Sequence, residues 1–196
     1  MGFGAEFEQI GTDPAREDLD RQDFNVFAKT LPMSWVEESL EKTGKQSIRK
    51  RKLPSEVVIW LVIGMALFRN MAITMVLRYL GLAATNLRPM KRPLGEGAAS
   101  SSITEARQRV GQEPLVELFD ISSRRWSEEF EELDTWRGMK VYAMDGTTLR
   151  IPDTEPNDEF FGRPSSGDRG KAAYPQARAV AVVGVTSRVL RGFNAG

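Results

Sequence analysis

A carboxylate that follows an apolar, strand-like segment is the group in this sequence best suited to chemistry. Asp145 comes directly after residues 141–144, whose apolar composition predicts a β-strand. Mg²⁺ prefers hard carboxylate oxygens as ligands, and metal-dependent phosphoryl transfer needs acids that hold the ions in place. Asp145 is therefore a candidate metal ligand and catalytic residue, with Mg²⁺ as the expected metal.

Asp145 and Gly146 are also typical of a two-residue hairpin turn. They stand between residues 141–144 and 147–151, and Asp-Gly between strand-like segments is a strong signal for such a turn. From the residue pattern alone, the turn is the preferred interpretation. The two interpretations are partly compatible, because a strand can end at a metal ligand and Gly146 can relieve the backbone there.

A pair of metal ions needs several acids, and the segment after Asp145 does not supply them in suitable places. Prolines and paired glycines interrupt this segment, which predicts a loop rather than a strand or helix. Its acids are Asp153, Glu155, Asp158, Glu159 and Asp168. We expect Asp153 to be a turn or loop carboxylate. Because the sequence stops just after another apolar segment, we also expect a truncated chain.

Composition and charge exclude several other functions. The sequence has no cysteine and no histidine, which excludes disulfides, thiolate or His-ligated zinc sites and a Ser-His-Asp triad. Residues 1–23 are acidic, which predicts a disordered tail and not a signal peptide. Residues 42–52 are basic and contain no acid. Such a cluster is most often a solvated linker, but Lys50, Arg51 and Lys52 are also candidates for contacts with DNA phosphates.

Apolar periodicity predicts a helical domain over residues 24–136. The first helix is outlined by an apolar face at Met33, Val36 and Leu40, a capping box at Ser34 and Glu37, and Gly44 at its end. Residues 57–68 are apolar on every side. They are too few for the roughly twenty that cross a membrane, so we expect a buried central helix with Pro54 in its first turn and no membrane association. A further amphipathic helix is expected to end at Gly81.

Two helices joined at Gly111 have the outline of a helix-turn-helix. The first has a capping box at Ser102 and Glu105 and an apolar face at Ile103, Ala106 and Val110. Acids at the start of the second helix would face phosphates badly. The predicted DNA contacts are therefore on the first helix, at Arg107, Gln108 and Arg109.

The C-terminal part predicts a sheet of three strands, formed by residues 141–144, 178–185 and 189–193. Both faces of the second strand are nearly apolar, so we expect it in the interior of the sheet. Because we expect a truncated chain, we also expect the helices and later strands that would cover this sheet to be missing. We therefore expect exposed faces and free edges, which promote aggregation.

Two blocks of sequence resemble the DDE-type bacterial insertion-element transposases of the insertion sequence 4 family. One consists of residues 53–62 (Leu-Pro-Ser-Glu-Val-Val-Ile-Trp-Leu-Val), residues 66–69 and residues 103–111 (Ile-Thr-Glu-Ala-Arg-Gln-Arg-Val-Gly). The other, which is more specific, consists of residues 145–154 (Asp-Gly-Thr-Thr-Leu-Arg-Ile-Pro-Asp-Thr) and residues 174–178 (Tyr-Pro-Gln-Ala-Arg). The resemblance covers the chain from about Phe24 onward.

This resemblance implies an α+β fold, with a helical DNA-binding N-terminal domain followed by the first strands of an incomplete RNase H-like domain over residues 137–196. In the family, three acids hold two Mg²⁺ ions that cut and join the ends of the element. Asp145 matches the first acid, and the second acid and the glutamate lie further along than this chain extends. The implied partners are DNA at the element ends and either a second copy of the chain or an intact transposase, in the bacterial cytoplasm at the nucleoid. The alternatives are a non-catalytic DNA-binding or regulatory fragment and a helical interaction protein.

Overall fold

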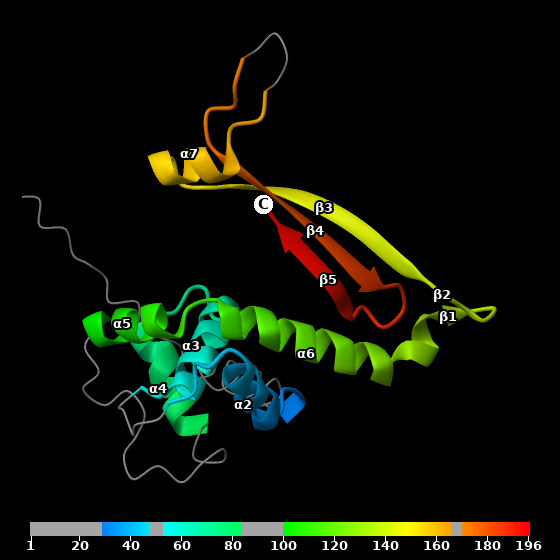
Figure 1. Ribbon diagram of the computed structural model, residues 1–196, viewed down its shortest axis with the longest axis horizontal. Helices are drawn as coiled ribbons and strands as arrows, with labels where there is room; N and C mark the ends of the chain where they lie inside the picture. The colour runs from blue at the N-terminus through cyan, green and yellow to red at the C-terminus, as the bar shows by residue number, and fades with distance from the viewer. Residues whose placement is uncertain (1–28, 48–52, 84–99, 166–169) are drawn as a thin grey trace, which may run out of the picture. The chain divides into compact units, whose positions relative to one another are not determined.

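The computed structural model of the protein describes residues 29–47, 53–83, 100–165 and 170–196, which form helices and antiparallel sheets (Figure 1). This confirms the α+β class. The chain divides into a helical unit, Met1–Leu118, and a sheet unit, Phe119–Gly196. This division falls inside a helix, whereas the predicted domains were 24–136 and 137–196, and those domain boundaries stay predictions. The predicted acidic tail, residues 1–23, lies outside the described residues.

The helical unit is built from α2 (Met33–Lys42), α3 (Ser55–Leu67), α4 (Ile73–Ala83), α5 (Ser100–Val110) and the first residues of α6 (Glu113–Glu129). Each helix contributes apolar side chains to the buried core. They include Val36, Leu40, Ile59, Leu61, Val76, Leu77, Ile103 and Val110. The predicted apolar faces of α2, α4 and α5 are thus confirmed, because i, i+3 and i+4 positions share one side of a helix.

The ends of α2 differ in how well the sequence predicted them. Pro32, in an extended conformation, occupies the N-cap without a side-chain hydrogen bond, so the predicted Ser34/Glu37 capping box is wrong. At the other end, Gly44 has φ of 66°. Its N–H donates to Glu41 O at 3.0 Å, and Lys45 N–H donates to Leu40 O at 2.8 Å. This is the Schellman arrangement, in which the left-handed residue favours glycine, so the predicted cap is confirmed.

Three further helix signals were misplaced by a turn or less. Pro54 is the N-cap of α3 rather than part of its first turn. The predicted capping box at Ser102 is wrong, because α5 already includes Ser100. The predicted end of α4 at Gly81 is also wrong, because the helix continues to Ala83. None of the helices formed by described residues is long and apolar enough to span a membrane.

The helix α3 is buried on all sides only in its first half. The four consecutive residues Val58, Ile59, Trp60 and Leu61 are 0–3% exposed. Because successive helical residues are about 100° apart, these four side chains point in all directions around the helix axis. Leu67 at the end of the helix is 49% exposed. The predicted central position of this helix is therefore confirmed for its first half.

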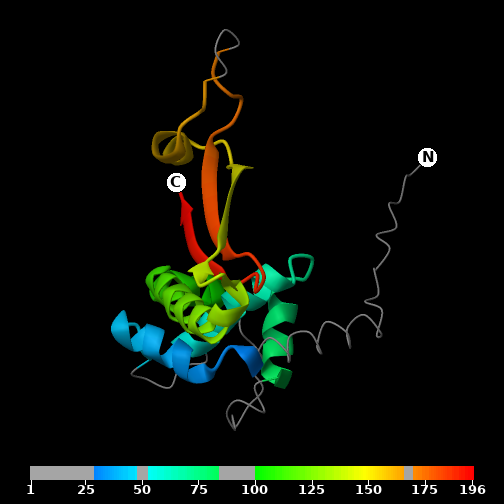
Figure 2. The same cartoon turned by 90° about the vertical axis from the view of Figure 1, so that its right-hand side faces the viewer.

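The sheet unit contains the rest of α6, a short 3₁₀ helix (Glu131–Asp134), and the hairpin of β1 (Thr135–Trp136) and β2 (Met139–Lys140). The three-stranded antiparallel sheet follows, with β3 (Tyr142–Arg150), β4 (Gln176–Gly184) and β5 (Leu190–Ala195) in the order β3-β4-β5. Figure 2 shows these three strands side by side. The predicted strands are confirmed, and so is the interior place of the strand now labelled β4.

Part of the segment predicted as loop is helical. The helix α7 (Glu155–Phe161) has Pro156 among its first residues. Proline suits this position, because the first turn of a helix does not need its N–H groups for internal hydrogen bonds. The acids Glu155, Asp158 and Glu159 therefore lie on a helix, contrary to the prediction.

Candidate functional site

Asp145 lies in the middle of β3, neither at a turn nor at the end of a strand. All nine residues of β3 pair with β4, with Asp145 opposite Ala181 and Gly146 opposite Val180. The hairpin prediction for Asp145-Gly146 is therefore wrong, and so is the placement of the strand's end. A reversal occurs instead at Arg137 and Gly138, whose φ angles of 50° and 79° are those that a two-residue turn requires.

The tertiary ladder overrides the local turn signal at Gly146. A Cβ atom added at this glycine would lie 3.5 Å from Ala179 O and 3.7 Å from Val180 Cγ2, which are ordinary packing distances. Gly146 thus keeps an extended conformation that any residue can adopt. The uninterrupted pairing with β4 stabilises that conformation more than a turn would.

The carboxylate of Asp145 is exposed, and its neighbours on the same face of the sheet have small side chains. Its Oδ1 accepts a hydrogen bond from Gly146 N–H at 2.8 Å. Because side chains alternate between faces, Ala143 and Thr147 share its face, as does Ala181 on the neighbouring strand. These short side chains leave the carboxylate oxygens accessible to a cation or another ligand.

Asp145 is the single acid of the three strands β3, β4 and β5. The described part of the chain contains no group of three or more Asp, Glu, His or Cys side chains that could hold a metal ion. Asp153 and Asp158, on the segment after β3, both bind Arg163, at 2.5 and 3.0 Å. The described residues therefore supply one hard oxygen ligand at Asp145 and do not by themselves form a magnesium site.

The predicted DNA contacts on α5 are only partly free to bind. Arg107, Gln108 and Arg109 are all exposed, whereas Ile103 and Ala106 of the same helix are buried. However, Arg109 Nη2 donates a hydrogen bond to Leu53 O at 2.9 Å. Arg109 therefore ties α5 to Leu53, two residues before α3 begins, whereas Arg107 and Gln108 make no such contact with a described residue. The other predicted contacts, Lys50, Arg51 and Lys52, lie outside the described residues.

Comparison with known families confirms the resemblance. Residues 21–120 match the family described as Insertion element 4 transposase N-terminal. The chain belongs to the insertion element 4 transposase family. The matched region contains the described helices α2 to α5.

Two relatives of this transposase-family chain come from Escherichia coli (strain K12). "Putative transposase InsZ" is 33% identical over 165 residues, which are 84% of this chain and 52% of that protein. "Transposase InsG for insertion sequence element IS4" is 30% identical over 176 residues, which are 90% of this chain and 38% of that protein. The chain thus spans about half the length of one relative and less of the other. No solved structure matches the chain.

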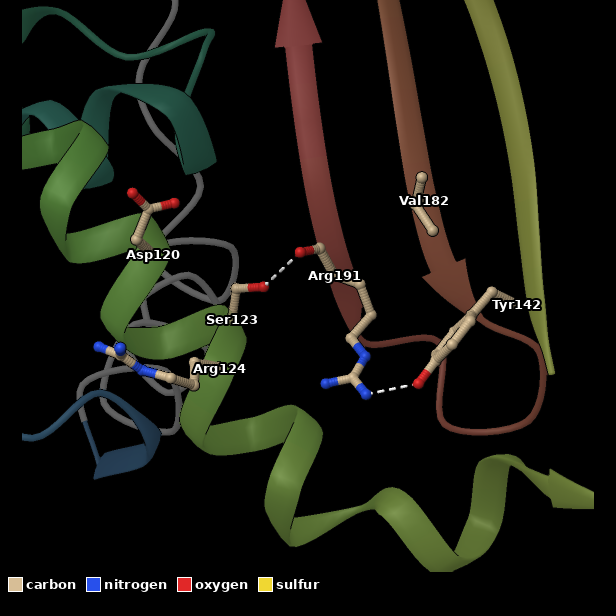
Figure 3. Close-up of a pocket in the computed structure, with 6 residues that line it drawn as sticks. All are labelled: Asp120, Ser123, Arg124, Tyr142, Val182 and Arg191. Carbon is tan, nitrogen blue, oxygen red and sulfur yellow. Dashed lines mark hydrogen bonds between the residues drawn. The ribbon is translucent and has the colours of Figure 1, made fainter. Parts of the chain in front are cut away.

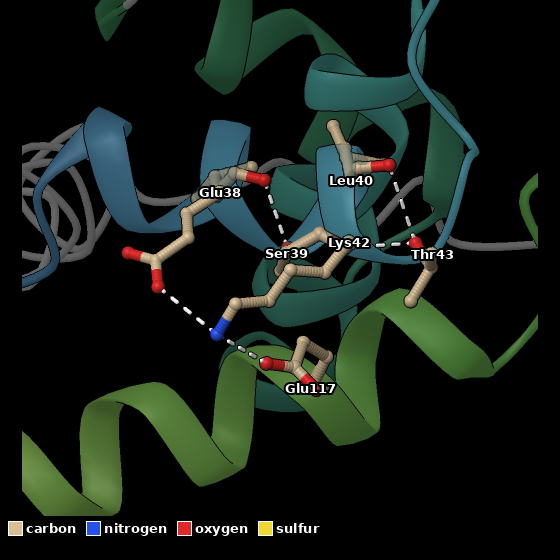
Figure 4. A network of polar contacts seen from close by, with 7 residues as sticks. Glu38, Ser39, Leu40, Lys42, Thr43 and Glu117 are labelled. Carbon is tan, nitrogen blue, oxygen red and sulfur yellow. Dashed lines mark hydrogen bonds and ion pairs between the residues drawn. The ribbon is translucent and has the colours of Figure 1, made fainter.

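The basic cluster of this transposase-family chain is partly neutralised by acids from α6 and by Glu38 of α2. Lys42 Nζ lies 2.9 Å from Glu117 Oε1 and 3.1 Å from Glu38 Oε1 (Figure 4). Hydrogen bonds to these two carboxylates, first to Glu117, raise the pKa of Lys42 above its ordinary value. Lys45 Nζ is 3.9 Å from Glu113 Oε2. Residues 42–52 contain no acid themselves, and the partners of Lys42 and Lys45 are Glu38, one turn earlier on α2, and the α6 residues Glu117 and Glu113.

A buried carboxylate that the sequence analysis did not single out holds one end of the sheet. Asp134, 7% exposed, accepts hydrogen bonds from Thr186 N–H and Ser187 N–H, both at 2.9 Å, and from Ser187 Oγ at 2.6 Å. Hydrogen bonds from Ser187 are the largest cause of its lowered pKa. A Cβ at Gly184 would overlap Asp134 Oδ2. No local sequence signal marks this contact, because its partners are about fifty residues apart.

A depression of about 420 Å³ lies between α6 and the sheet. It is lined by Asp120, Ser123, Arg124, Tyr142, Val182 and Arg191 (Figure 3). Arg191 Nη2 donates to Tyr142 Oη at 2.5 Å, and its guanidinium lies 4.9 Å from the ring centre. Ser123 Oγ donates to Leu190 O and Arg191 O, at 2.7 and 3.0 Å. These contacts join α6 to β5, so the depression is explained by the packing of the unit.

Proposed function

We propose that this chain takes part in DNA transposition and that Asp145 is the first of the three acids of a DDE transposase. Family membership supports this proposal, since both relatives are named as transposases. The observation that carries the assignment to Asp145 is its exposed place in the middle of β3, among short side chains on one face of the sheet. An accessible carboxylate on a rigid strand suits metal binding.

The same proposal makes the sheet the opening of an RNase H-like domain. The antiparallel order β3-β4-β5 supplies the three strands expected there. In members of the family, the second acid and the glutamate come later in the sequence than the acid that Asp145 matches. When bound, Mg²⁺ would activate water or a DNA 3′-hydroxyl for attack on phosphate. Asp145 would contribute one oxygen ligand to that ion.

A second proposal is a non-catalytic DNA-binding role, in which the chain occupies element ends or associates with an intact transposase. The absence of a group of three or more possible metal ligands among the described residues supports this alternative. The exposed Arg107 and Gln108 of α5 would contact the DNA. In both proposals the protein binds DNA, and they differ in whether it cuts.

DNA binding and DNA cutting are therefore measured together on duplexes that carry the element ends. Both proposals predict binding that weakens with salt, and weaker binding by Arg107→Ala with a slope of log K against log salt smaller by about 1. The first proposal predicts Mg²⁺-dependent nicking by a chain that carries all three acids, and its loss to background in Asp145→Asn. Nicking that Asp145→Asn leaves unchanged would refute the catalytic assignment. Absence of DNA binding would refute both proposals.

A further inference from the structure

The two faces of the three-stranded sheet carry different chemistry. Thr148 pairs directly with Arg178, and Arg150 pairs with Gln176, in the register of β3 and β4. Since side chains alternate along a strand, Thr148, Arg150 and Arg178 all lie on the face opposite Asp145. Val180 pairs with Asn194 of β5, which places Asn194 on this face as well.

This second face is exposed and basic. Thr148, Arg150, Arg178 and Asn194 are all exposed. Arg150 lies over the ring of Tyr174, with 5.9 Å between its guanidinium carbon and the ring centre, and Tyr174 is 47% exposed. We call the surface formed by Thr148, Arg150, Tyr174, Arg178 and Asn194 the arginine face.

Arg150 and Arg178 are not paired with the described acids that lie close to them in the sequence. Neither Arg150 nor Arg178 forms an ion pair with a described residue. None of the described β3, β4 and β5 residues that share the arginine face is acidic, since the single acid of these strands is Asp145. After β3, Asp153 and Asp158 are bound to Arg163, which leaves Glu155 and Glu159 on α7 as the nearby unpaired acids.

We propose that the arginine face is a binding surface for the phosphodiester backbone of DNA. This inference rests on the proposed function and adds a contact surface separate from both Asp145 and α5. Guanidinium groups bind phosphate oxygens through paired N–H donors, and hydroxyl and amide groups commonly add phosphate contacts. Thr148 and Asn194 supply those groups beside the two arginines.

The geometry of the sheet favours an extended polyanion over a single small anion. Arg150 and Arg178 are diagonal neighbours on paired strands, and such positions are roughly 7–8 Å apart. The strands hold them at a fixed spacing, and the ring of Tyr174 supports the Arg150 side chain. Two separated cations with hydroxyl and amide groups beside them match successive phosphates of one strand.

The test is DNA binding by the 196-residue chain, measured by fluorescence anisotropy from about 50 to about 200 mM salt. Arg150→Ala with Arg178→Ala is compared with a control that removes two exposed arginines outside the sheet, Arg69→Ala with Arg124→Ala. We expect the sheet variant to lower the slope of log K against log salt by about 1.8, because each lost phosphate contact accounts for about 0.9. Its affinity at low salt should fall about tenfold or more. Arg150→Lys with Arg178→Lys should keep most of the slope.

The outcomes separate this inference from the proposed function. If the unaltered chain binds DNA and the sheet variant behaves like the control, the arginine face is not a DNA surface, while the proposed function stands. If the sheet variant binds an acidic protein partner less well but binds DNA normally, the inference also fails. If the unaltered chain does not bind DNA, both fail. Far-UV circular dichroism of each variant checks that these exposed substitutions leave the fold intact.

Discussion

The helical unit and the sheet unit differ in how completely they bury their apolar side chains. In the helical unit, Ile59 and Leu61 are 0% exposed and Val76 is 1% exposed. In the sheet unit, Met144 is 73% exposed and Phe193 is 55% exposed, and all nine residues of β3 are exposed. Several helices can bury one another's apolar stripes, whereas a three-stranded sheet has two broad faces and needs further layers to cover both.

This contrast indicates which contacts stabilise each unit and which of its surfaces are available for binding. The helical unit has a core of its own, so exposed residues such as Arg107 are not needed for that core and can contribute to binding. The sheet unit relies on contacts at its ends, such as those of Asp134, and exposes both the Asp145 face and the arginine face. Exposed apolar side chains between such groups also make the sheet unit the part that we expect to aggregate.

The strongest test of the contrast is a pair of truncations to alanine, one in each unit. Ile59→Ala should lower the free energy of unfolding by about 2–5 kcal/mol, because it removes a fully buried side chain and leaves a cavity. Met144→Ala should change it by less than about 0.5 kcal/mol. Urea denaturation followed by circular dichroism measures both. Equal losses of unfolding free energy in the two variants would show that Met144 is covered in solution.

A second pair concerns glycine. Gly44 has φ of 66° at the end of α2, so Gly44→Ala should cost about 1–2 kcal/mol, since a Cβ disfavours this conformation. Gly146 is extended in β3 with room for a Cβ, so Gly146→Ala should be neutral or slightly stabilising. Thermal melting of both variants provides the measurement. A large loss at Gly146 would mean that it adopts the turn suggested by the local sequence.

The smallest and most local effect is expected at Asp134, as a dependence on pH. Its pKa is lowered in the folded protein, first by the Ser187 hydroxyl and then by the Ser187 N–H. The ionised form therefore stabilises the fold above the ordinary value of 3.8, and this stabilisation is lost as the pH falls through the lower folded-state pKa. The amide signals of Thr186 and Ser187, followed by NMR, should shift in that acidic range.

Asp134→Asn should remove this titration and weaken protection of the two amides from hydrogen exchange at neutral pH. Asp120→Asn, a change at an exposed acid on α6, serves as the control and should leave both amides unaffected. If Thr186 and Ser187 respond equally to the two variants, the hydrogen bonds of Asp134 do not hold the end of the sheet.

Features that depend on near neighbours in the chain could be predicted from the sequence, whereas features that depend on distant segments could not. Val36 and Leu40 mark a helix face through neighbours three to four residues apart, and Gly44 marks its end through bonds within one turn. Gly146 looked like a turn by the same local criteria. Its conformation is fixed instead by β4, whose residue Val180 lies far along the chain. Lys42 shows the same limit, because its partner Glu117 comes from a distant helix.

By itself the sequence determined the α+β class, the family, the three strands and their apolar central member. Apolar periodicity and motif residues involve only neighbouring positions, so they can be read directly from the sequence. The tertiary structure decided that Asp145 lies within a strand, that Arg109 is tied to Leu53 while Arg107 is not, and that Arg150 and Arg178 share a face. Each of these depends on which distant segment supplies the hydrogen-bond partner or sets the strand register. A one-residue shift in that register would send every side chain of a strand to the other face.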